Sequence, residues 1–440
     1  MANRIVKIED ICHVVKGETG IMKAIPGEFP MVVLSEERKT HNEYQFDCKA
    51  VIIPLVSSTG HGHASMKRIH YQEGKFALGS ILCALIPKKE GEYDPEYLYH
   101  ILDMGKERIF VPLMKGMANV SLPMNRIKSV EINLPPYDEQ VRLSKIYTEV
   151  TKNVDILGNQ KDKQQKYLKQ LRQSILLMAI QGKLTAKWRE ENPNVEAANV
   201  LLEKIIAKKE QLIKEGKIRR EKPLPKISDA EKIFELPDGW VWSKLGEFTQ
   251  FLSGNNFKST DFKKGSGAKC IKITNAGVSK LIETDDVLPS EFVELYPSYL
   301  IYENDLILAL TRPYIADGLK ISKCPKSYNR SLLNQRVAAI RVYSQFSQDY
   351  IYEFLRSSIV LDKYKSMFAG KIQQPNLKKE DVTHLTVPIP PFEEQKEIVS
   401  KVNQLMSWCD ELEQKIEKRD SYQKRIIQAV VKQAFTTIKV

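Results

Sequence analysis

The sequence is informative first for what it lacks. Its six cysteines include no Cys-x-x-Cys pair, which argues against a zinc ribbon or a disulfide framework and is typical of a reducing cytoplasm. No stretch approaches the roughly 18 uncharged apolar residues of a membrane span. The N-terminus has no apolar core of signal-peptide length. We therefore expect a cytoplasmic protein with no membrane association.

Signatures of catalysis are equally scarce. The Gly-His-Gly-His run at 60–63 is not followed by Gly-Lys-Ser/Thr, so it is no Walker loop, and its histidines have no evident third metal ligand. Residues 133–137 resemble the Asn-Pro-Pro-Tyr motif of amino-methyltransferases, but Leu134 spoils the spacing and no Gly-rich loop follows a first strand. The Glu-x-Lys at 413–415 lies within a helical pattern. We predict no catalytic residue, cofactor site or metal site in this chain.

Length and charge give the broad class. A chain of 440 residues favours two or three domains. Lys and Arg number 67 against 55 Asp and Glu, which gives a formal net charge of +12. This excess favours a polyanionic partner, most simply nucleic acid, although many soluble proteins are also basic.

What the sequence does contain is an internal repeat. Residues 134–140 (Leu-Pro-Pro-Tyr-Asp-Glu-Gln) align with 389–395 (Ile-Pro-Pro-Phe-Glu-Glu-Gln), and the alignment continues without a gap for about 60 positions at a spacing of 255. The repeated part is a turn and a long helix, whereas the preceding parts are much less alike. A shared framework with two divergent heads predicts a protein that reads two different things at a fixed distance.

Both copies of the repeat have heptad spacing, which places one apolar stripe along a helix. We expect the first helix to begin with Asp138 as its N-cap and to end or kink at Gly182. The stripes contain Leu143, Tyr147, Val150, Val154, Leu157, Leu168, Leu171, Ile175 and Met178, and then Ile398, Val402, Leu405, Cys409, Leu412, Ile416, Ile426 and Val430. Each stripe needs a partner, and the simplest partner is the other stripe, parallel or antiparallel. The alternative is two unrelated amphipathic helices, each packed on its own domain.

The two heads are rich in short β-type runs, and each also holds one amphipathic helix, so both are predicted to be α+β domains. The second is predicted to be a diverged relative of the first. We divide the chain into a first head (1–137), a central helical region with a Pro-rich basic linker (138–235), a second head (236–391) and a C-terminal helical region (392–440).

The loops of both heads carry residue types that pair with base edges or phosphates. Polar loops are common on any protein surface, so each residue is an individual hypothesis. The candidate DNA-binding residues are Arg38, Lys39, His61, His63, Lys67, Arg68, Asn255, Asn256, Lys258, Arg312, Tyr314, Arg330, Gln335 and Arg336.

The order of these parts resembles the specificity (S) subunit of type I restriction-modification systems, along the whole chain. The doubled Pro-Pro-x-(Asp/Glu)-Glu-Gln turn carries the resemblance, and the Leu-Pro-Asp-Gly-Trp phrase at 236–240 adds to it. The first head lacks such a phrase before residues 4–8, which bears on the edge of that domain and not on the family.

The resemblance implies an α+β fold in which two α/β target recognition domains are separated by two long conserved helices that form an antiparallel coiled coil. Each head would read one half of an asymmetric, bipartite double-stranded DNA target, and the helices would set the gap and dock two methylation subunits. The chain would be a non-catalytic subunit of an adenine-specific methyltransferase, and restriction subunits would complete an ATP-dependent endonuclease. S-adenosylmethionine, ATP and Mg2+ would belong to those partners.

Two other classes remain open on the sequence alone. One is a self-contained DNA methyltransferase or nuclease with an unrecognised site, which would bind a cofactor as the isolated chain. The other is a non-enzymatic coiled-coil scaffold or repressor. The recognised bases, the gap length and the loop residues that touch DNA do not follow from the sequence.

Overall fold

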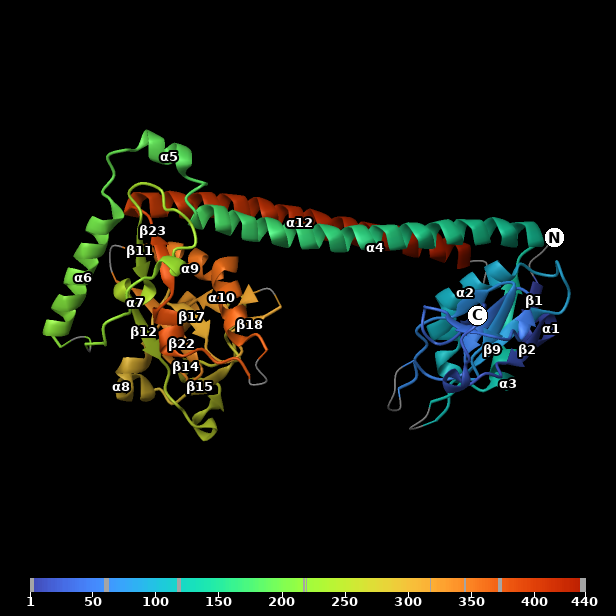
Figure 1. The fold of residues 1–440 in the computed structure, drawn as a ribbon. Helices are drawn as coiled ribbons and strands as arrows, with labels where there is room; N and C mark the ends of the chain where they lie inside the picture. The colour runs from blue at the N-terminus through green and yellow to red at the C-terminus, as the bar shows by residue number, and fades with distance from the viewer. Residues whose placement is uncertain are drawn as a thin grey trace. The chain divides into compact units, whose positions relative to one another are not determined.

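The structure is a computed structural model, drawn in Figure 1. It describes residues 4–58, 63–116, 120–216, 218, 220–316, 318–343, 346–370 and 374–435. The chain forms two compact units, which are described separately: unit 1 comprises Met1–Lys163 with Ile416–Val440, and unit 2 comprises Gln164–Lys415. The four domain ranges given above stay predictions.

The head of unit 1 is built on two four-stranded sheets. One has the order β2-β9-β6-β7 and the other β4-β3-β8-β5, and a separate ladder pairs β1 with β10. The bounds are β1 Arg4–Lys7, β2 Cys12–Lys16, β3 Phe29–Val32, β4 Lys39–His41, β5 Phe46–Asp47, β6 Ala50–Pro54, β7 His70–Gln72, β8 Lys75–Leu78, β9 Leu82–Pro87 and β10 Glu131–Leu134. The central strand β6 is buried along its whole length, as its unbroken apolar run predicts.

The head of unit 2 repeats this plan. Its sheets have the orders β12-β22-β17-β20 and β13-β15-β14-β21-β16, and β11 pairs with β23. The bounds are β11 Val241–Lys244, β12 Thr249–Ser253, β13 Lys263–Lys264, β14 Ala268–Ile271, β15 Asp286–Leu288, β16 Leu300–Ile301, β17 Leu306–Ala309, β18 Tyr314–Ile315, β19 Gly318–Leu319, β20 Ile321–Lys323, β21 Ser331–Leu333, β22 Val337–Val342 and β23 Thr386–Ile389. The parallel pair β3–β8 matches the parallel pair β14–β21. The second head is therefore a diverged relative of the first, as predicted.

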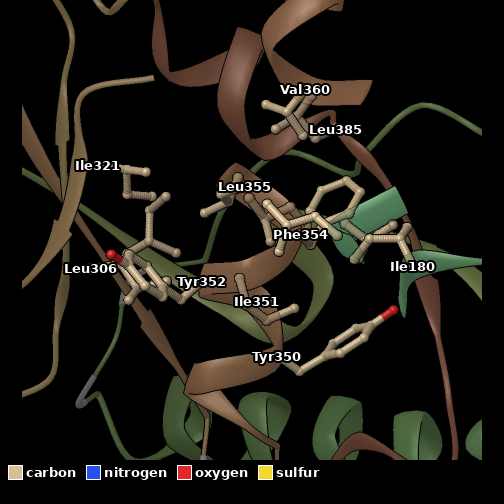
Figure 2. Close-up of a cluster of buried hydrophobic side chains, with 14 of the residues drawn as sticks. Ile180, Leu306, Ile321, Tyr350, Ile351, Tyr352, Phe354, Leu355, Val360 and Leu385 are labelled. Carbon is tan, nitrogen blue, oxygen red and sulfur yellow. The ribbon is translucent and has the colours of Figure 1, made fainter. Parts of the chain in front are cut away.

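Helices cover these sheets. The bounds are α1 Ile8–Ile11, α2 Pro95–Ile109, α3 Met124–Lys128, α5 Ala186–Glu191, α6 Ala198–Lys214, α7 Leu245–Phe248, α8 Phe292–Leu295, α9 Gln348–Arg356, α10 Ser358–Phe368 and α11 Lys379–Thr383. The side chain of Asp94 caps α2, and that of Ser347 caps α9. Figure 2 shows the core of unit 2, in which Ile351 and Phe354 of α9 lie among apolar side chains that include Leu306 and Ile180.

The two long helices have equal lengths. Helix α4 spans Tyr137–Ile180 and α12 spans Phe392–Phe435, with 44 residues each. Because α4 already begins at Tyr137, the prediction of Asp138 as the N-cap was wrong, and Asp138 lies in the first turn. The end is as predicted, because Gly182 has a φ of 68°. Its N–H donates to Ala179 O (3.0 Å) and that of Lys183 to Met178 O (2.9 Å), as in a Schellman motif. Among the described residues, no helix combines the length and apolar character needed to cross a membrane.

The long helices pair antiparallel within each unit. In unit 2 Arg172 Nη2 donates to Asp410 (2.6 Å), and Lys401 Nζ donates to the carbonyl of Leu184 (3.2 Å). In unit 1 Lys161 Nζ donates to Asp420 (2.7 Å). Residue numbers rise along α4 as they fall along α12, so the orientation left open by the residue pattern is antiparallel, as the resemblance implies.

The predicted apolar stripes are only partly correct. Leu168, Ile175, Ile398 and Val402 are buried, but Leu171, Met178, Leu412 and Ile426 are 44%, 42%, 46% and 63% exposed. A pair of helices buries only a narrow seam of each, and in unit 2 Arg172 takes a position on that seam. The side chains of Val154 and Val430 lie outside the described part of the chain.

Candidate nucleic-acid interface

The repeated turn attaches each head to its long helix through one glutamine. Gln140 Nε2 donates to Pro135 O (2.7 Å), while its Oε1 accepts from the backbone N–H of Asp94, the N-cap of α2 (2.9 Å). Gln395 makes the same two bonds, to Pro390 O (2.9 Å) and from the N–H of Ser347, the N-cap of α9 (3.0 Å). Both side chains are buried. The last residue of the repeated motif is therefore a structural joint, and the two prolines form the turn as predicted.

At one edge of each head, the loops are held in place by main-chain hydrogen bonds. In unit 2 these bonds are Asn255 N to Leu333 O (2.9 Å), Gln335 N to Asn255 O (2.7 Å), Leu310 N to Arg336 O (2.9 Å), Leu377 N to Leu310 O (2.8 Å) and Arg312 N to Pro375 O (2.9 Å). We call this set the loop frame. It brings together Asn255, Arg312, Gln335 and Arg336, four of the candidate DNA-binding residues, from loops far apart in the sequence.

The loop frame recurs in unit 1. Its bonds are Thr19 N to Leu78 O (3.3 Å), Ser80 N to Thr19 O (2.9 Å), Leu55 N to Ile81 O (2.9 Å), Leu122 N to Leu55 O (2.8 Å) and Ser57 N to Val120 O (3.0 Å). Each frame also needs a glycine. A Cβ on Gly17 would overlap the carbonyl oxygen of Gly79, and a Cβ on Gly254 would overlap that of Asn334. Ser57, Ser80 and Ile81 thus occupy the backbone positions of Arg312, Gln335 and Arg336.

Arg312 and Arg336 both have left-handed backbones, with φ of 48° and 68°. Non-glycine residues rarely adopt this region, and at functional sites the surrounding structure enforces it. Here the frame bonds at Arg312 N and Arg336 O enforce it. Both side chains are exposed, and neither guanidinium pairs with a carboxylate in the described part of the chain.

A hollow of about 490 Å³ lies between these loops. We call it the arginine hollow. It is lined by Ile273, Thr274, Ala276, Gly277, Ile282, Thr311, Arg312, Ile315, Lys320, Arg336 and Gln374. Among these described residues three are cationic and none is acidic. The prediction from sequence missed Thr274, Thr311, Lys320 and Gln374, because only the pairing of β17 with β20 and the return of residues 374–377 bring them to this edge.

The other candidates of the second head are more dispersed. Asn256 and Lys258 are exposed just beyond Asn255. Tyr314, in β18, packs against the core of unit 2. Arg330 precedes β21, whereas Gln335 follows it, so Arg330 lies at the opposite end of that strand, 3.6 Å from a carboxylate oxygen of Glu294.

In the first head, the candidate arginines are engaged internally. Arg38 donates to Gln72 Oε1 (3.0 Å), to the Nδ1 of His70 (3.2 Å) and to Tyr71 O (3.2 Å). Burial lowers the pKa of Arg38. Arg68 pairs with Glu36 at 3.2 Å. Lys39, His63 and Lys67 are exposed, and His61 lies outside the described residues.

His70 is a feature that the sequence did not reveal. It is buried, and burial together with the charges of Arg38 and Arg68 lowers its pKa to about 4. The neutral ring can accept the Arg38 hydrogen bond, whereas the protonated ring would repel both arginines. Burial also lowers the pKa of His100, on α2, to about 4. The described residues include no group of three or more His, Cys, Asp or Glu side chains placed to hold a metal ion.

Comparison with known proteins identifies the family. Residues 3–166 and 237–419 match the family described as the type I restriction modification DNA specificity domain. The chain belongs to this family. It is similar to the specificity subunit of the type I restriction enzyme EcoAI from Escherichia coli, with 36% identity over 55% of this chain and 40% of the relative. With the EcoDI specificity subunit of the same species it shares 21% identity over 98% of this chain and 87% of the relative.

Solved structures of this family share the fold. A chain from a study of complex assembly and conformational transition of the type I R-M system has a TM-score of 0.66 at 16% identity, covering 99% of this chain and 97% of that chain. The HsdS subunit from Thermoanaerobacter tengcongensis has a TM-score of 0.52 at 16% identity, covering 99% and 96%. The match spans only 40% and 44% of the EcoAI and EcoEI subunits, the latter also from Escherichia coli.

Proposed function

We propose that this chain is the DNA sequence-recognition subunit of a type I restriction-modification complex, in which each head reads one half of a bipartite double-stranded target. The observation that carries this proposal is the recurrence of one loop frame with different side chains. The frame offers Asn255, Arg312 and Arg336 in the second head, and Thr19, Ser57 and Ile81 in the first. Heads that differ at equivalent loop positions are suited to different half-sites.

The second head would use Gln335 and Asn255 as its reading residues, with Arg312 and Arg336 beside them on the same loops. Asparagine and glutamine pair bidentately with adenine, and each good pair contributes about 1–3 kcal/mol of discrimination. In the first head, Lys39, His63 and Lys67 are the exposed candidates. Arg38 and Arg68 would instead shape the surface, because their guanidinium groups are bound within the head.

The long helices would set the gap between the half-sites. Helices α4 and α12 both contribute residues to both units, and a continuous 44-residue helix is about 66 Å long at 1.5 Å per residue. A helix that passes through both units is a suitable spacer, because its length depends little on side-chain sequence.

The same helices would dock two methylation subunits. In unit 2 they expose the apolar side chains Tyr167, Leu171, Met178, Trp408 and Leu412, and exposed apolar side chains are often found on protein-binding surfaces. S-adenosylmethionine would be bound by these methylation subunits, and ATP and Mg2+ by the complex with restriction subunits. This chain would contribute no catalytic residue. The family assignment leaves a self-contained methyltransferase or nuclease, or a scaffold or repressor, without support.

The first test is methylome sequencing of a host that expresses the neighbouring methylation subunit with and without this chain. We expect a bipartite adenine motif that appears only when the chain is present. A motif that is identical without the chain, or the absence of any motif when the methylation subunit is active with another specificity subunit, would contradict the proposal.

The spacer is tested by inserting four residues into α4 between Asn153 and Lys169, which adds about one turn and 6 Å. We expect the methylated motif to change its gap or to be lost, while both half-site sequences stay the same. The matched control places the same four residues in the exposed linker after Glu221. An unchanged gap in the α4 variant would rule out the spacer role.

A further inference from the structure

The arginine hollow combines three cations that form no ion pair with the described carboxylates. Arg312 and Arg336 are exposed, and Lys320, which immediately precedes β20, also lines the hollow and donates its backbone N–H to Pro313 O (2.7 Å). Thr274 and Thr311 add hydroxyl groups to the same wall. Both arginines occupy their places with a left-handed backbone, which is unfavourable for a residue with a side chain. Such strain at two positions around one hollow indicates a site under functional constraint.

Among the described residues, the first head offers no equivalent set of charges. The backbone positions of Arg312 and Arg336 hold Ser57 and Ile81. The strand register places Arg68 where the second head has Lys320, but Arg68 is paired with Glu36. The two heads thus share the positions of these loops and differ in the free positive charge that the loops present.

We propose that the arginine hollow binds one phosphate group of the DNA backbone, and that the described residues at the equivalent positions of the first head form no such site. The shape favours a phosphate over a base edge, because phosphates project from a duplex, whereas base edges lie recessed in the grooves and are reached by projecting side chains. The guanidinium groups can form paired hydrogen bonds to the phosphate oxygens, and Lys320 adds a point charge.

This proposal rests on the proposed function only in taking DNA as the ligand. It adds that the second head holds the backbone at a fixed point and so sets the register in which its reading loops meet the bases. A backbone contact of this kind acts on every sequence alike and releases counterions, so it contributes to the salt dependence of binding and not to base preference.

The experiment measures the affinity of the full chain for a duplex of unrelated sequence at several NaCl concentrations. The variants are Arg312→Asn, Arg336→Asn and the double variant, because asparagine tolerates a left-handed backbone. Lys326→Asn is the matched control, since Lys326 is an exposed cation of the same head that precedes β21 and does not line the hollow. Thermal unfolding of each variant reports whether the fold is retained.

We expect each single variant to reduce the slope of log affinity against log salt by about one. The double variant should reduce the slope by no more than either single variant does, because both arginines hold the same phosphate. Lys326→Asn should leave the slope unchanged. An unchanged slope in the arginine variants, an additive loss of about two, or an equal loss in the control would each overturn the proposal.

Two further arms separate the alternatives. Glycine relieves the backbone strain, so Arg312→Gly and Arg336→Gly should keep or raise the unfolding temperature while they reduce the slope; a loss of stability would mean that the arginines are structural.

If the hollow binds the phosphate of a small molecule instead, inorganic phosphate will protect the wild-type chain and not the double variant against unfolding, with the DNA slope unchanged, and the proposal fails. Because the duplex is of unrelated sequence, the result does not depend on whether the chain also recognises a bipartite motif.

Discussion

The two turns that begin the long helices have similar sequences, but their equivalent glutamates differ in exposure to solvent. In unit 1 Glu139 pairs with Arg142 of its own helix at 2.6 Å, and their side chains are 40% and 60% exposed. In unit 2 the equivalent Glu394 is fully buried. A repeated motif can therefore hold one residue whose role is the same in both copies, the glutamine, beside another whose role is set by the rest of the chain.

The surroundings of Glu394 come from the segment that follows helix α4 and from the start of the second head. Its carboxylate accepts hydrogen bonds from Arg189 Nη2 (2.8 Å), Thr185 Oγ1 (2.7 Å) and Trp240 Nε1 (2.8 Å). Trp240 belongs to the Leu-Pro-Asp-Gly-Trp phrase at 236–240. This phrase therefore supplies one of the hydrogen-bond donors of a buried carboxylate site.

The largest expected difference comes from Glu394→Ala against Glu139→Ala. The first leaves Arg189 and the Trp240 N–H without their partner, so unit 2 should lose about 3–5 kcal/mol. The second removes an exposed pair, which contributes less than about 1 kcal/mol. Denaturant unfolding followed by tryptophan fluorescence measures the first effect, because all four tryptophans lie in unit 2. Glu394→Gln is the control that keeps the size of the side chain and removes its charge. Equal destabilisation by the two alanine variants would contradict the prediction.

The next largest expected difference is the loss of stability of the two heads in acid. His70 and His100, both in unit 1, have pKa values of about 4 because of burial, whereas the unfolded chain binds their protons near pH 6.5. Unit 1 therefore has its full stability above about pH 6.5 and loses it as the pH falls toward 4, by about 1–2 kcal/mol per histidine at pH 5. Carboxylates such as Glu231, whose pKa the hydrogen bond from Lys244 lowers to about 2, lose their contribution only below about pH 4.5.

The measurement compares circular dichroism with tryptophan fluorescence during denaturant unfolding at pH 7 and pH 5. Unit 1 contains no tryptophan, so we expect a weakened transition at pH 5 that dichroism detects and fluorescence does not. His70→Gln and His100→Gln should flatten this pH dependence. A parallel shift of both signals would show that the histidines do not distinguish the units.

The smallest expected difference is between Gln140→Ala and Gln395→Ala. The two variants should lower the free energy of unfolding by nearly the same amount. Each variant leaves a proline carbonyl and the N-cap N–H of a head helix without a partner, at a cost of about 1–3 kcal/mol. Hydrogen exchange at the first turns of α2 and α9 reports each joint separately. We expect similar increases in exchange at the two helices, and a marked inequality would mean that the two joints are not equivalent.

The sequence predicts the framework of this protein better than its surface. The 255-residue spacing and the Pro-Pro turn revealed both long helices, because these signals are local and repeated. The exposure of Leu171 and Leu412 was not predicted, since it depends on which face the partner helix covers. Arg38 has the residue type of a DNA ligand, but three of the groups that accept its hydrogen bonds, on His70, Tyr71 and Gln72, lie more than 30 residues away. For the same reason, the meeting of Arg312 with Lys320 and Gln374 required the folded sheet.

The loop frame has a consequence for how such a protein changes over generations. Its bonds join main-chain atoms, so a point mutation at positions 57, 80, 81, 312, 335 or 336 alters the side chain on offer and leaves the loop where it was. New side chains can then accumulate at these positions one substitution at a time, without passing through misfolded intermediates.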